Sequence, residues 1–558
     1  MSASSKKKLR KAQEAEKLTE KQLKEQKEAK QLKIYSTLFV VVLALVVVAA
    51  VWIGVSKTVE NSGVRERSTT AVTIGEHELS NAELNYFYID AINKFYSDYG
   101  SYATMFGLDT TLPLNEQVVN EETGLTWADD FLNSAKENAK AVYALADEAK
   151  AQGYTLTEDE LAAIDSDLAS LELYANLYGY TDAQTYLKAM YGKGATMENY
   201  RAYAELTTLA GSYQAYYANS LVYDDADLRE AEKDNYAEYS SFSYNSYYLS
   251  ASRFLEGGTT GDDGNTTYSD AETAASVSAA EEAANILAGG EYESVADFDA
   301  AIAALEINAE TENAASTAYE DHAYAKINSV IQEWVTDENR QIGDVASIPS
   351  VTHSHEEGEE HSDDEDASEH ETINGYYVVY FNGSNDNTFA LANVRHILVA
   401  FEHDHNESEE HDHSEQTYTD AEKAAAKNAA DELLAQWKAG DATEESFAAL
   451  ANENSDDGDG TTGGLYEDVY PGQMVPSFND WCFDESRKTG DTEVIESEYG
   501  YHVMYYVSDS DTNYRDYQIR NALVTEATNS WFNALLENMT ITDGNTAYIS
   551  KDLVLTAA

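Results

Sequence analysis

The sequence predicts an α+β protein with an N-terminal transmembrane helix, a mostly helical domain, two tandem α+β domains of one type and a C-terminal helix. Three observations lead to this prediction. The 558-residue chain has one long uncharged apolar run near its N-terminus. A stretch with apolar residues at spacings of three and four follows it. The remainder then repeats itself in three ordered blocks.

The apolar run, 34–55, has no charged residue in 22 positions. At about 1.5 Å per residue it spans roughly 33 Å, enough for a hydrocarbon core of about 30 Å. Residues 1–33 carry eleven Lys or Arg and five Glu, so we expect them in the cytoplasm. This predicts a single-pass bacterial cell-membrane protein whose bulk, after a linker at 56–70, is extracytoplasmic. A cleaved signal peptide is the alternative, whereas a lipid anchor would need a cysteine that the run lacks.

The composition excludes several classes of protein. The chain has 102 acidic and 35 basic residues and a formal net charge of −67, which argues against a nucleic-acid partner. Its one cysteine, Cys482, excludes an intrachain disulfide and a Cys-based zinc site. Only four prolines are present, so this is not a Pro-rich disordered protein.

Residues 71–240 show helical periodicity, for example in WADDFLNSAKENAKAVYALADEAKAQG. Gly153 stands where a C-cap would end that helix, and Thr157 with Glu160 is a plausible capping box for the next one. The 41 tyrosines of the chain fit either of two interpretations. They pack helices with their hydroxyls at the surface, or they form an adaptable aromatic surface for unfolded polypeptides.

An internal repeat fills most of the second half of the chain. The first block has ten identities in 23 positions and the second has nine in 26. The paired segments are 268–290 with 418–440, 319–344 with 466–491, and 375–381 with 500–506. Because order and spacing agree, we interpret them as two copies of one α+β domain. Each copy has a strand, two helices, a loop, a short helix and a closing strand.

The second copy carries an ordered set of motifs: NVRHILV (393–399), FAALANENSDDGDGTTGGLYEDVYPGQMVPSF (447–478) and YGYHVMYY (499–506). This set resembles the parvulin family (PpiC or rotamase type) of peptidyl-prolyl cis/trans isomerases. The family pattern has an HIL strand, an F-x-x-L-A helix, an S-x-D loop, a Gly-Gly turn, a G-x-M-x-x-x-F helix and a closing G-x-H strand. The resemblance implies isomerisation of X–Pro bonds without a cofactor.

The resemblance also implies roles for the matching residues. His396 and His502 would be the paired histidines beneath the site. Asp457 would be the acidic residue near the twisting amide, with Asp456 as the alternative if the alignment slips by one.

Three further residues would bind the substrate proline. Met474 and Phe478 are expected on one face of a helix, because they are four positions apart. Tyr466, in GGLYE, stands where the family usually has an apolar Leu, and its ring would cover the proline.

The first copy lacks both histidines: Ser246 stands opposite His396, and Tyr377 opposite His502. It is therefore predicted to be a degenerate, inactive copy. The layout is similar to PrsA-like and SurA-like foldases, in which a helical chaperone domain accompanies parvulin domains. The expected parts are a basic cytoplasmic segment (1–33), a transmembrane helix (34–55), a linker (56–70), a helical SurA/PrsA-like chaperone domain (71–240), a degenerate parvulin-like domain with a His/acid-rich insertion (241–383), a parvulin domain (390–508) and a C-terminal helical segment (509–558).

Two acidic stretches, 353–370 and 402–413, hold eight of the twelve histidines. They are either solvated insertions or weak, exchangeable sites for a divalent metal such as Zn²⁺. The leading functional hypothesis is an extracytoplasmic isomerase with chaperone activity, whose clients are unfolded secreted or envelope polypeptides. Two alternatives stay open: a non-catalytic holdase that uses the parvulin fold for binding, and a metal-binding surface protein.

Overall fold

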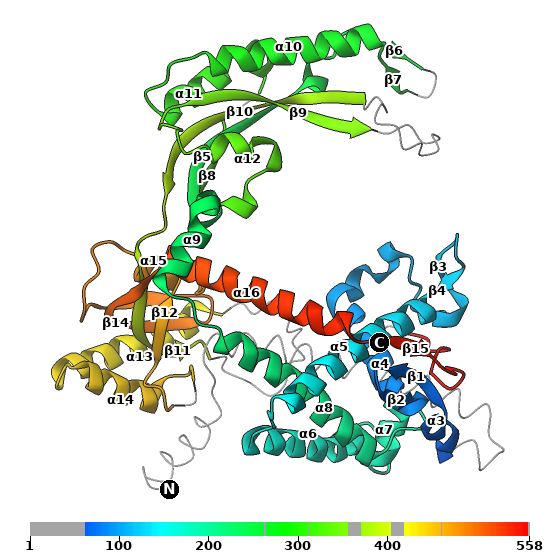
Figure 1. Cartoon of the computed structure of the whole chain (residues 1–558). Coiled ribbons are helices and arrows are strands. Elements are labelled where there is room, and N and C mark those ends of the chain that lie inside the picture. The colour runs from blue at the N-terminus through cyan, green and yellow to red at the C-terminus, as the bar shows by residue number, and fades with distance from the viewer. Residues whose placement is uncertain are drawn as a thin grey trace. The chain divides into compact units, whose positions relative to one another are not determined.

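The structure, a computed structural model, describes residues 62–261, 264–311, 313–354, 370–402, 418–458 and 460–555. These residues belong to two compact units, and the chain passes between the units repeatedly (Figure 1). Unit 1 comprises Met1–Val222, Val394–Ser508 and Ala522–Ala558, and unit 2 comprises Tyr223–Asn393 and Asp509–Asn521.

The predicted transmembrane helix requires a correction. Residues 34–55 lie outside the described residues. Within the described ranges, no helix combines the length and the apolar character needed to cross a membrane. Helix α5 (Trp127–Ala151) has 25 residues, but Asp, Glu and Lys recur along it, and a hydrocarbon core of about 30 Å disfavours such charges. The fold class is thus corrected to a mixed α/β chain with no assigned membrane helix. The expected single-pass membrane location is corrected with it.

The first part of unit 1 is mostly helical. Its helix ends follow from local sequence: Thr157 and Glu160 form the predicted capping box, and Gly153 has the left-handed φ of 74° just beyond α5. The elements are α3 (Val64–Ser68), β1 (Thr70–Ile74), β2 (His77–Ser80), α4 (Asn81–Tyr99), η2 (Gly100–Phe106), η3 (Leu114–Glu116), β3 (Val118–Asn120), β4 (Leu125–Thr126), α5, α6 (Glu158–Leu177), α7 (Ala183–Tyr191) and α8 (Met197–Ser220).

The end of the chain completes this helical part. Trp531, on helix α16 (Tyr514–Glu537), stacks on Tyr217 of α8 with a centroid distance of 3.8 Å. Strand β15 (Ile541–Asp543) pairs antiparallel with β1 to form the sheet β15-β1-β2. The C-terminal segment is therefore a helix followed by a strand and a tail with two turns, whose Leu553 and Leu555 are buried in the core.

Unit 2 is built around a four-stranded antiparallel sheet of order β8-β5-β10-β9. Helices α10 and α11 pack on one face of this sheet, and α12 packs on the other (Figure 1). The elements are α9 (Asp225–Asn235), η4 (Tyr236–Tyr239), β5 (Ser241–Ser250), η5 (Ala251–Phe254), β6 (Thr259–Thr260), β7 (Thr266–Thr267), α10 (Asp270–Ala288), α11 (Val295–Ala303), η6 (Glu306–Asn308), β8 (Thr317–Ala323), η7 (Tyr324–Lys326), α12 (Ser329–Val335), β9 (Val345–Ser354) and β10 (His370–Asn385).

The second sheet domain, centred on 394–508 of unit 1, repeats this order of elements. Its sheet has the order β12-β11-β14-β13, in which each strand occupies the place of its counterpart in unit 2. The elements are β11 (Ala390–Ala400), α13 (Asp420–Ala439), α14 (Glu444–Asn454), β12 (Leu465–Val469), α15 (Pro476–Cys482), β13 (Thr492–Glu496) and β14 (Gly500–Asn513).

Packing details recur in both sheet domains. Arg340 lies over the Trp334 ring at 4.0 Å, and Arg487 lies over the Trp481 ring at 4.1 Å. In each pair the arginine Nε also donates to the tryptophan carbonyl at 3.1 Å. These matched contacts explain why Arg and Trp persist in both copies while most surface residues differ.

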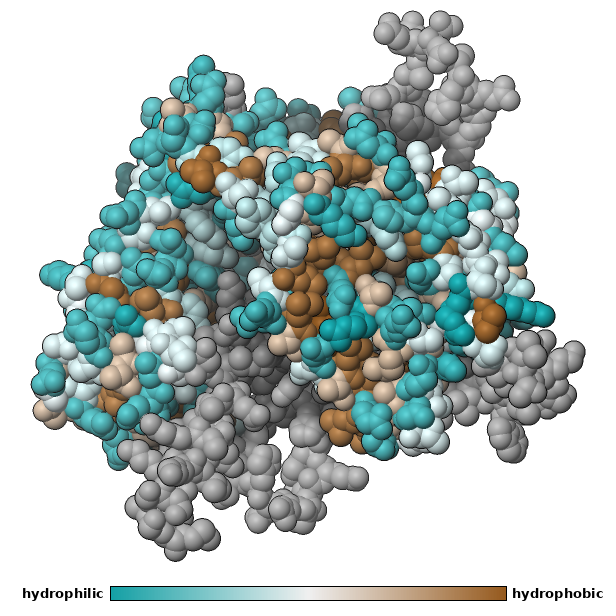
Figure 2. All heavy atoms as spheres, turned by 60° about the horizontal axis from the view of Figure 1, so that its bottom comes forward, coloured by the Kyte–Doolittle hydropathy of each residue, from teal (hydrophilic) through white to brown (hydrophobic). Residues whose placement is uncertain are grey.

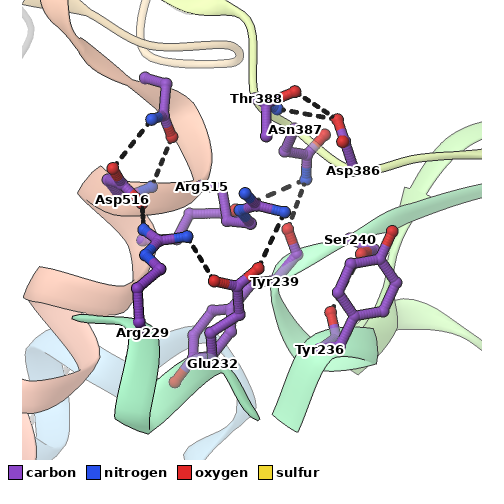
Figure 3. A network of polar contacts seen from close by, with 12 residues as sticks. Arg229, Glu232, Tyr236, Tyr239, Ser240, Asp386, Asn387, Thr388, Arg515 and Asp516 are labelled. Carbon is purple, nitrogen blue, oxygen red and sulfur yellow. Dashed lines mark hydrogen bonds and ion pairs between the residues drawn. The ribbon is translucent and has the colours of Figure 1, made fainter. Parts of the chain in front are cut away.

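A network of polar contacts fixes the base of unit 2, where α9, the β10–β11 connection and the start of α16 meet (Figure 3). Arg515 pairs with Glu232 at 2.9 Å, and Arg229 pairs with both Glu232 and Asp516. The Asn387 amide donates to the Tyr239 carbonyl at 2.9 Å. Charges and amides thus tie three distant chain segments to one another within this unit.

We expect Arg515→Ala to weaken unit 2, because Glu232 would lose a partner at a site where the two side chains are only 14% and 15% exposed. The expected loss is roughly 2 kcal/mol in the free energy of opening of β5 and β10, measured by hydrogen exchange. Arg229→Ala is the matched control, since the Arg229 side chain is 43% exposed, and its loss should stay below about 1 kcal/mol. Equal losses in the two variants would contradict this account of the network.

Candidate active site

Two buried histidines face each other across the centre of the second sheet domain. His396 is on β11 and His502 is on the neighbouring strand β14, and they are 1% and 0% exposed. Their Nδ1 atoms are 3.1 Å apart. One Nδ1 must carry a hydrogen and the other must accept it, so the contact fixes the tautomers of both rings.

A buried carboxylate continues this contact. Asp457 Oδ2 lies 2.6 Å from His396 Nε2, and both side chains are at most 2% exposed. Ser455 holds the loop in place, because its hydroxyl accepts from the amides of Leu398 and Asp457, each at 3.1 Å. The structure thus brings Asp457 to the histidines. Asp456, the alternative considered from sequence, instead accepts from the Ala400 amide at 2.9 Å.

A serine that the sequence analysis missed lies at the other end. Ser497 Oγ is 2.8 Å from His502 Nε2. It sits in the turn between β13 and β14, where the Ser497 amide also bonds the Gly500 carbonyl at 2.8 Å. The one signal for it in the sequence is a hydroxyl residue five positions before the histidine, and that signal is weak without the hairpin register.

The four groups form a chain with one consistent direction of donation. With Asp457 ionised, its carboxylate accepts from His396 Nε2–H, His396 Nδ1 then accepts from His502 Nδ1–H, and His502 Nε2 accepts from the Ser497 hydroxyl. In this assignment each ring donates once and accepts once, so both imidazoles are neutral. The single negative charge lies on Asp457, which the chain of donors stabilises away from water.

Aromatic rings surround this chain. Phe478, on α15, is fully buried and meets both rings edge-on, at 5.2 Å from His396 and 5.6 Å from His502. The Tyr466 ring, on β12, is 5.2 Å from His396, and its hydroxyl is 3.3 Å from Asp457 Oδ2. The predicted residues Tyr466 and Phe478 therefore lie together with the histidines, and they form an apolar wall with one phenol.

Met474 is placed differently from the expectation. It lies in the turn before α15, half-buried, and not on one helix face with Phe478. The reason is Pro476, which occupies the first turn of α15 and fixes the start of the helix after Met474. The spacing of four residues therefore did not reflect helical periodicity.

A two-glycine turn holds β12 against β11. Gly464 has a φ of 66°, and a Cβ atom there would lie 2.1 Å from the His396 carbonyl oxygen, so only glycine fits. From the opposite side of β11, Arg395 donates to the carbonyls of Thr462 and Gly463 at 3.1 and 3.0 Å and pairs with Glu444 at 3.0 Å. These contacts set the position of Tyr466 relative to the histidines.

Cys482 is not poised as a nucleophile, and the described residues offer no metal-binding cluster. Burial raises the pKa of the Cys482 thiol to about 12, so the thiol stays protonated and is no nucleophile near neutral pH. Among the described residues, no group of three His, Cys, Asp or Glu side chains could hold a metal ion. The predicted His-rich stretches lie mostly outside the described residues, so weak metal binding there stays a prediction.

The positions in unit 2 that correspond to the two histidines carry different side chains. Ser246 faces Val379 in the register of β5 and β10, and the Tyr377 ring packs at a tilt against Tyr248, with a centroid distance of 4.6 Å. The Tyr377 hydroxyl accepts from the Asn328 amide at 3.1 Å. The apolar floor remains, with Ile331 2% exposed, but Ser246 and Tyr377 stand in place of the two histidines.

Residues 377–509 match the family described as the PPIC-type PPIASE domain, a range that starts earlier than the predicted 390–508. No curated protein matches the chain. Among solved structures, the chain is similar to the peptidylprolyl isomerase PrsA from Bacillus anthracis, with 23% identity, a TM-score of 0.17 and coverage of 27% of this chain and 59% of that one. The chain thus spans about three fifths of that protein. Residues 377–509 are thus a PPIC-type, or parvulin-type, peptidyl-prolyl isomerase domain.

Proposed function

We propose that this chain is a protein-folding factor that isomerises X–Pro bonds in unfolded polypeptides at the His396–His502 site. The observation that carries the proposal is the buried chain of donors that ends on Asp457 beside the aromatic wall. The resemblance implies secreted or envelope clients. The residues of this site support the broader class of unfolded polypeptides that contain proline.

The chemistry required is rotation about an amide bond, with a barrier of about 18–20 kcal/mol and no bond made or broken. The planar amide is strongly dipolar, and twisting returns the lone pair to nitrogen and reduces the negative charge on the carbonyl oxygen. A dry pocket with a fixed carboxylate near that oxygen therefore favours the twisted state over both planar ones. Phe478 and Tyr466 would exclude water and hold the proline ring.

The histidines position the carboxylate and do not exchange protons with the substrate. His396 fixes the direction of Asp457 through the 2.6 Å contact, and His502 with Ser497 fixes the tautomer of His396. Such a network keeps its geometry while the substrate rotates, so little reorganisation is needed in the transition state.

Unit 2 is proposed to be a degenerate copy of the isomerase domain. Its sheet order and its Arg340–Trp334 contact support the common fold. Ser246 and Tyr377 in place of the histidines support the absence of activity. This copy would bind clients or act as a spacer.

Chaperone activity is the second part of the proposal. Exposed apolar side chains occur on the first part of unit 1, including Tyr102, Met105 and Phe106 at 61%, 80% and 53% exposure. Brown apolar patches interrupt the hydrophilic surface in Figure 2. Exposed apolar area of this kind favours contact with unfolded chains. A holdase that does not catalyse isomerisation is the alternative, motivated by Tyr466 in place of the usual Leu.

Asp457→Asn should lower kcat/KM for a short X–Pro peptide by roughly 10- to 100-fold, because it removes the charge and keeps the shape. Asp456→Asn is the matched control, since it makes the same change one residue away and should alter kcat/KM less than about twofold. Line-shape or exchange NMR on the peptide measures both. A fully active, folded Asp457→Asn variant would refute the assigned role, and an inactive parent would favour the holdase.

The double variant His396→Ala, His502→Ala tests both sheet domains at once. We expect its turnover to fall to the uncatalysed rate, since unit 2 lacks the histidine chain. Circular dichroism and hydrogen exchange of β5 and β10 check that the rest of the chain is folded. Residual turnover that survives in the folded double variant would show that unit 2 is active.

Two substitutions of Tyr466 separate the contribution of its hydroxyl group from that of its aromatic ring. Tyr466→Phe keeps the ring and should retain kcat/KM within about threefold, because the hydroxyl contact to Asp457 is long at 3.3 Å. Tyr466→Ala should lose roughly tenfold, mostly as a higher KM, because the proline ring loses its apolar cover. Equal activity of the parent and the alanine variant would exclude this ring from the pocket.

A further inference from the structure

Arg395 adjoins His396 on β11 but takes no part in the chain of hydrogen bonds between the histidines and Asp457. Successive side chains of a strand leave opposite faces of the sheet, so the guanidinium lies on the face away from the histidines. Its Nη1 donates to the carbonyls of Thr462 and Gly463 at 3.1 and 3.0 Å, and its Nε pairs with a glutamate of α14 at 3.0 Å. The side chain is only 14% exposed, so these partners replace most of the water that it loses.

Two neighbouring residues of β11 hold three successive carbonyl groups of one turn, 462–464. Arg395 binds the first two through its side chain, and the backbone amide of His396 donates to the third at 3.0 Å. The amide of Gly463 in the same turn donates to Asn452 Oδ1 at 2.6 Å. The turn therefore cannot slide along β11 without losing several hydrogen bonds at once, each of which costs free energy when its buried group is left without a partner.

The guanidinium also packs directly against this turn. A Cβ atom at Gly463 would lie 2.8 Å from Arg395 Nη1 and 2.7 Å from the Ala448 Cβ, so the turn is confined between the arginine and α14. Strand β12 leaves the turn and carries Tyr466 three residues after Gly463. The Tyr466 ring lies 5.2 Å from the His396 ring, on the other face of the sheet from the guanidinium. A displacement of the turn would therefore displace this ring relative to the histidines.

Unit 2 ties the corresponding turn to its strand by a different contact. Asn245 stands opposite Arg395 in the repeat, and Ser316 stands opposite Gly463. The Asn245 side-chain amide donates to the Ser316 hydroxyl at 2.8 Å, which is a contact between neutral groups. Hydrogen bonds from a charged donor are roughly twice as strong as those between neutral groups. The copy with the histidine chain thus holds this turn more firmly, although the strand order is the same in both copies.

We propose that Arg395 is a positioning residue of the isomerase site, which acts through the 462–464 turn to hold the Tyr466 ring over the substrate proline. The inference rests on the proposed isomerase function and adds a residue that determines substrate affinity from outside the pocket. Arg395 reaches the substrate only through Tyr466, and the hydrogen-bonded chain that ends on Asp457 does not include it. Its loss should therefore raise KM and leave kcat in place.

Arg395→Met in the full chain keeps most of the side-chain length and removes the donors. With a short Ala-Pro peptide, we expect KM to rise roughly three- to tenfold and kcat to stay within about twofold. Glu444→Gln is the matched control, because it removes the charge of the same ion pair and leaves the two carbonyl contacts of Arg395 in place. The control should keep KM within about twofold. An equal rise of KM in both variants, or a loss confined to kcat, would overturn the assigned role.

A double-mutant cycle with Tyr466→Ala distinguishes positioning from a general loss of stability. If Arg395 acts through the ring, Arg395→Met should change KM by less than about twofold once Tyr466→Ala has removed that ring. A purely structural role would instead give the same change in both backgrounds. Hydrogen exchange of β11 and β14 checks that each variant is folded. Effects on KM that add across the cycle would overturn the proposal.

Arg395→Lys replaces the methionine variant in the cycle if the latter does not fold. It keeps the charge, but its shorter reach weakens the contacts with the two carbonyls, so KM should again rise in the parent and not in the Tyr466→Ala background. A KM that is unchanged in the parent background, or a rise that persists without the ring, contradicts the role of Arg395. Absent turnover in the unsubstituted chain instead overturns the isomerase function itself, and the role of Arg395 with it.

Discussion

A carboxylate can remain charged beside an apolar pocket only if hydrogen bonds replace the water that it loses, and this constraint organises the isomerase domain. Asp457 is 5% exposed, and the compensation comes from His396, which is itself fixed by His502 and Ser497. These groups come from β11, β14 and the turn before β14. The two central strands must therefore be neighbours for this series of hydrogen bonds to form. The Gly464 turn, where a Cβ atom would collide with the His396 carbonyl, follows from the same requirement.

A comparison of the two sheet domains distinguishes the residues that maintain the fold from the residues that form the site. Both keep the strand order and the Arg-over-Trp contact, and both bury apolar residues under the short helix. Only one keeps the histidines. The sheet is thus stable with Ser246 and Tyr377 at these positions, because packing on both faces supplies the burial that the fold needs. The same strand order is thus compatible with either set of residues at these two positions.

The order of the sequence motifs was enough to predict that five residues lie close together: His396, His502, Asp457, Tyr466 and Phe478. The motif order fixed which strands and loops would meet, although the roles of these residues stay predictions. Ser497 was missed because a hydroxyl in a turn has no periodic signal, and its partner depends on the register of β13 and β14. Met474 was assigned to a helix face because spacing alone cannot show that Pro476 starts the helix later. The transmembrane helix was inferred from one apolar run, and among the described residues no helix supports it.

Charge acts on this protein at two length scales that do not interfere. Inside the pocket, one carboxylate and two neutral imidazoles give a local field that depends on contacts of about 3 Å and is insensitive to salt. Outside it, the excess of 102 acidic over 35 basic residues acts through solvent and is screened by salt. The local chemistry and the long-range charge can therefore be separated by experiment, because added salt weakens the second and leaves the first in place.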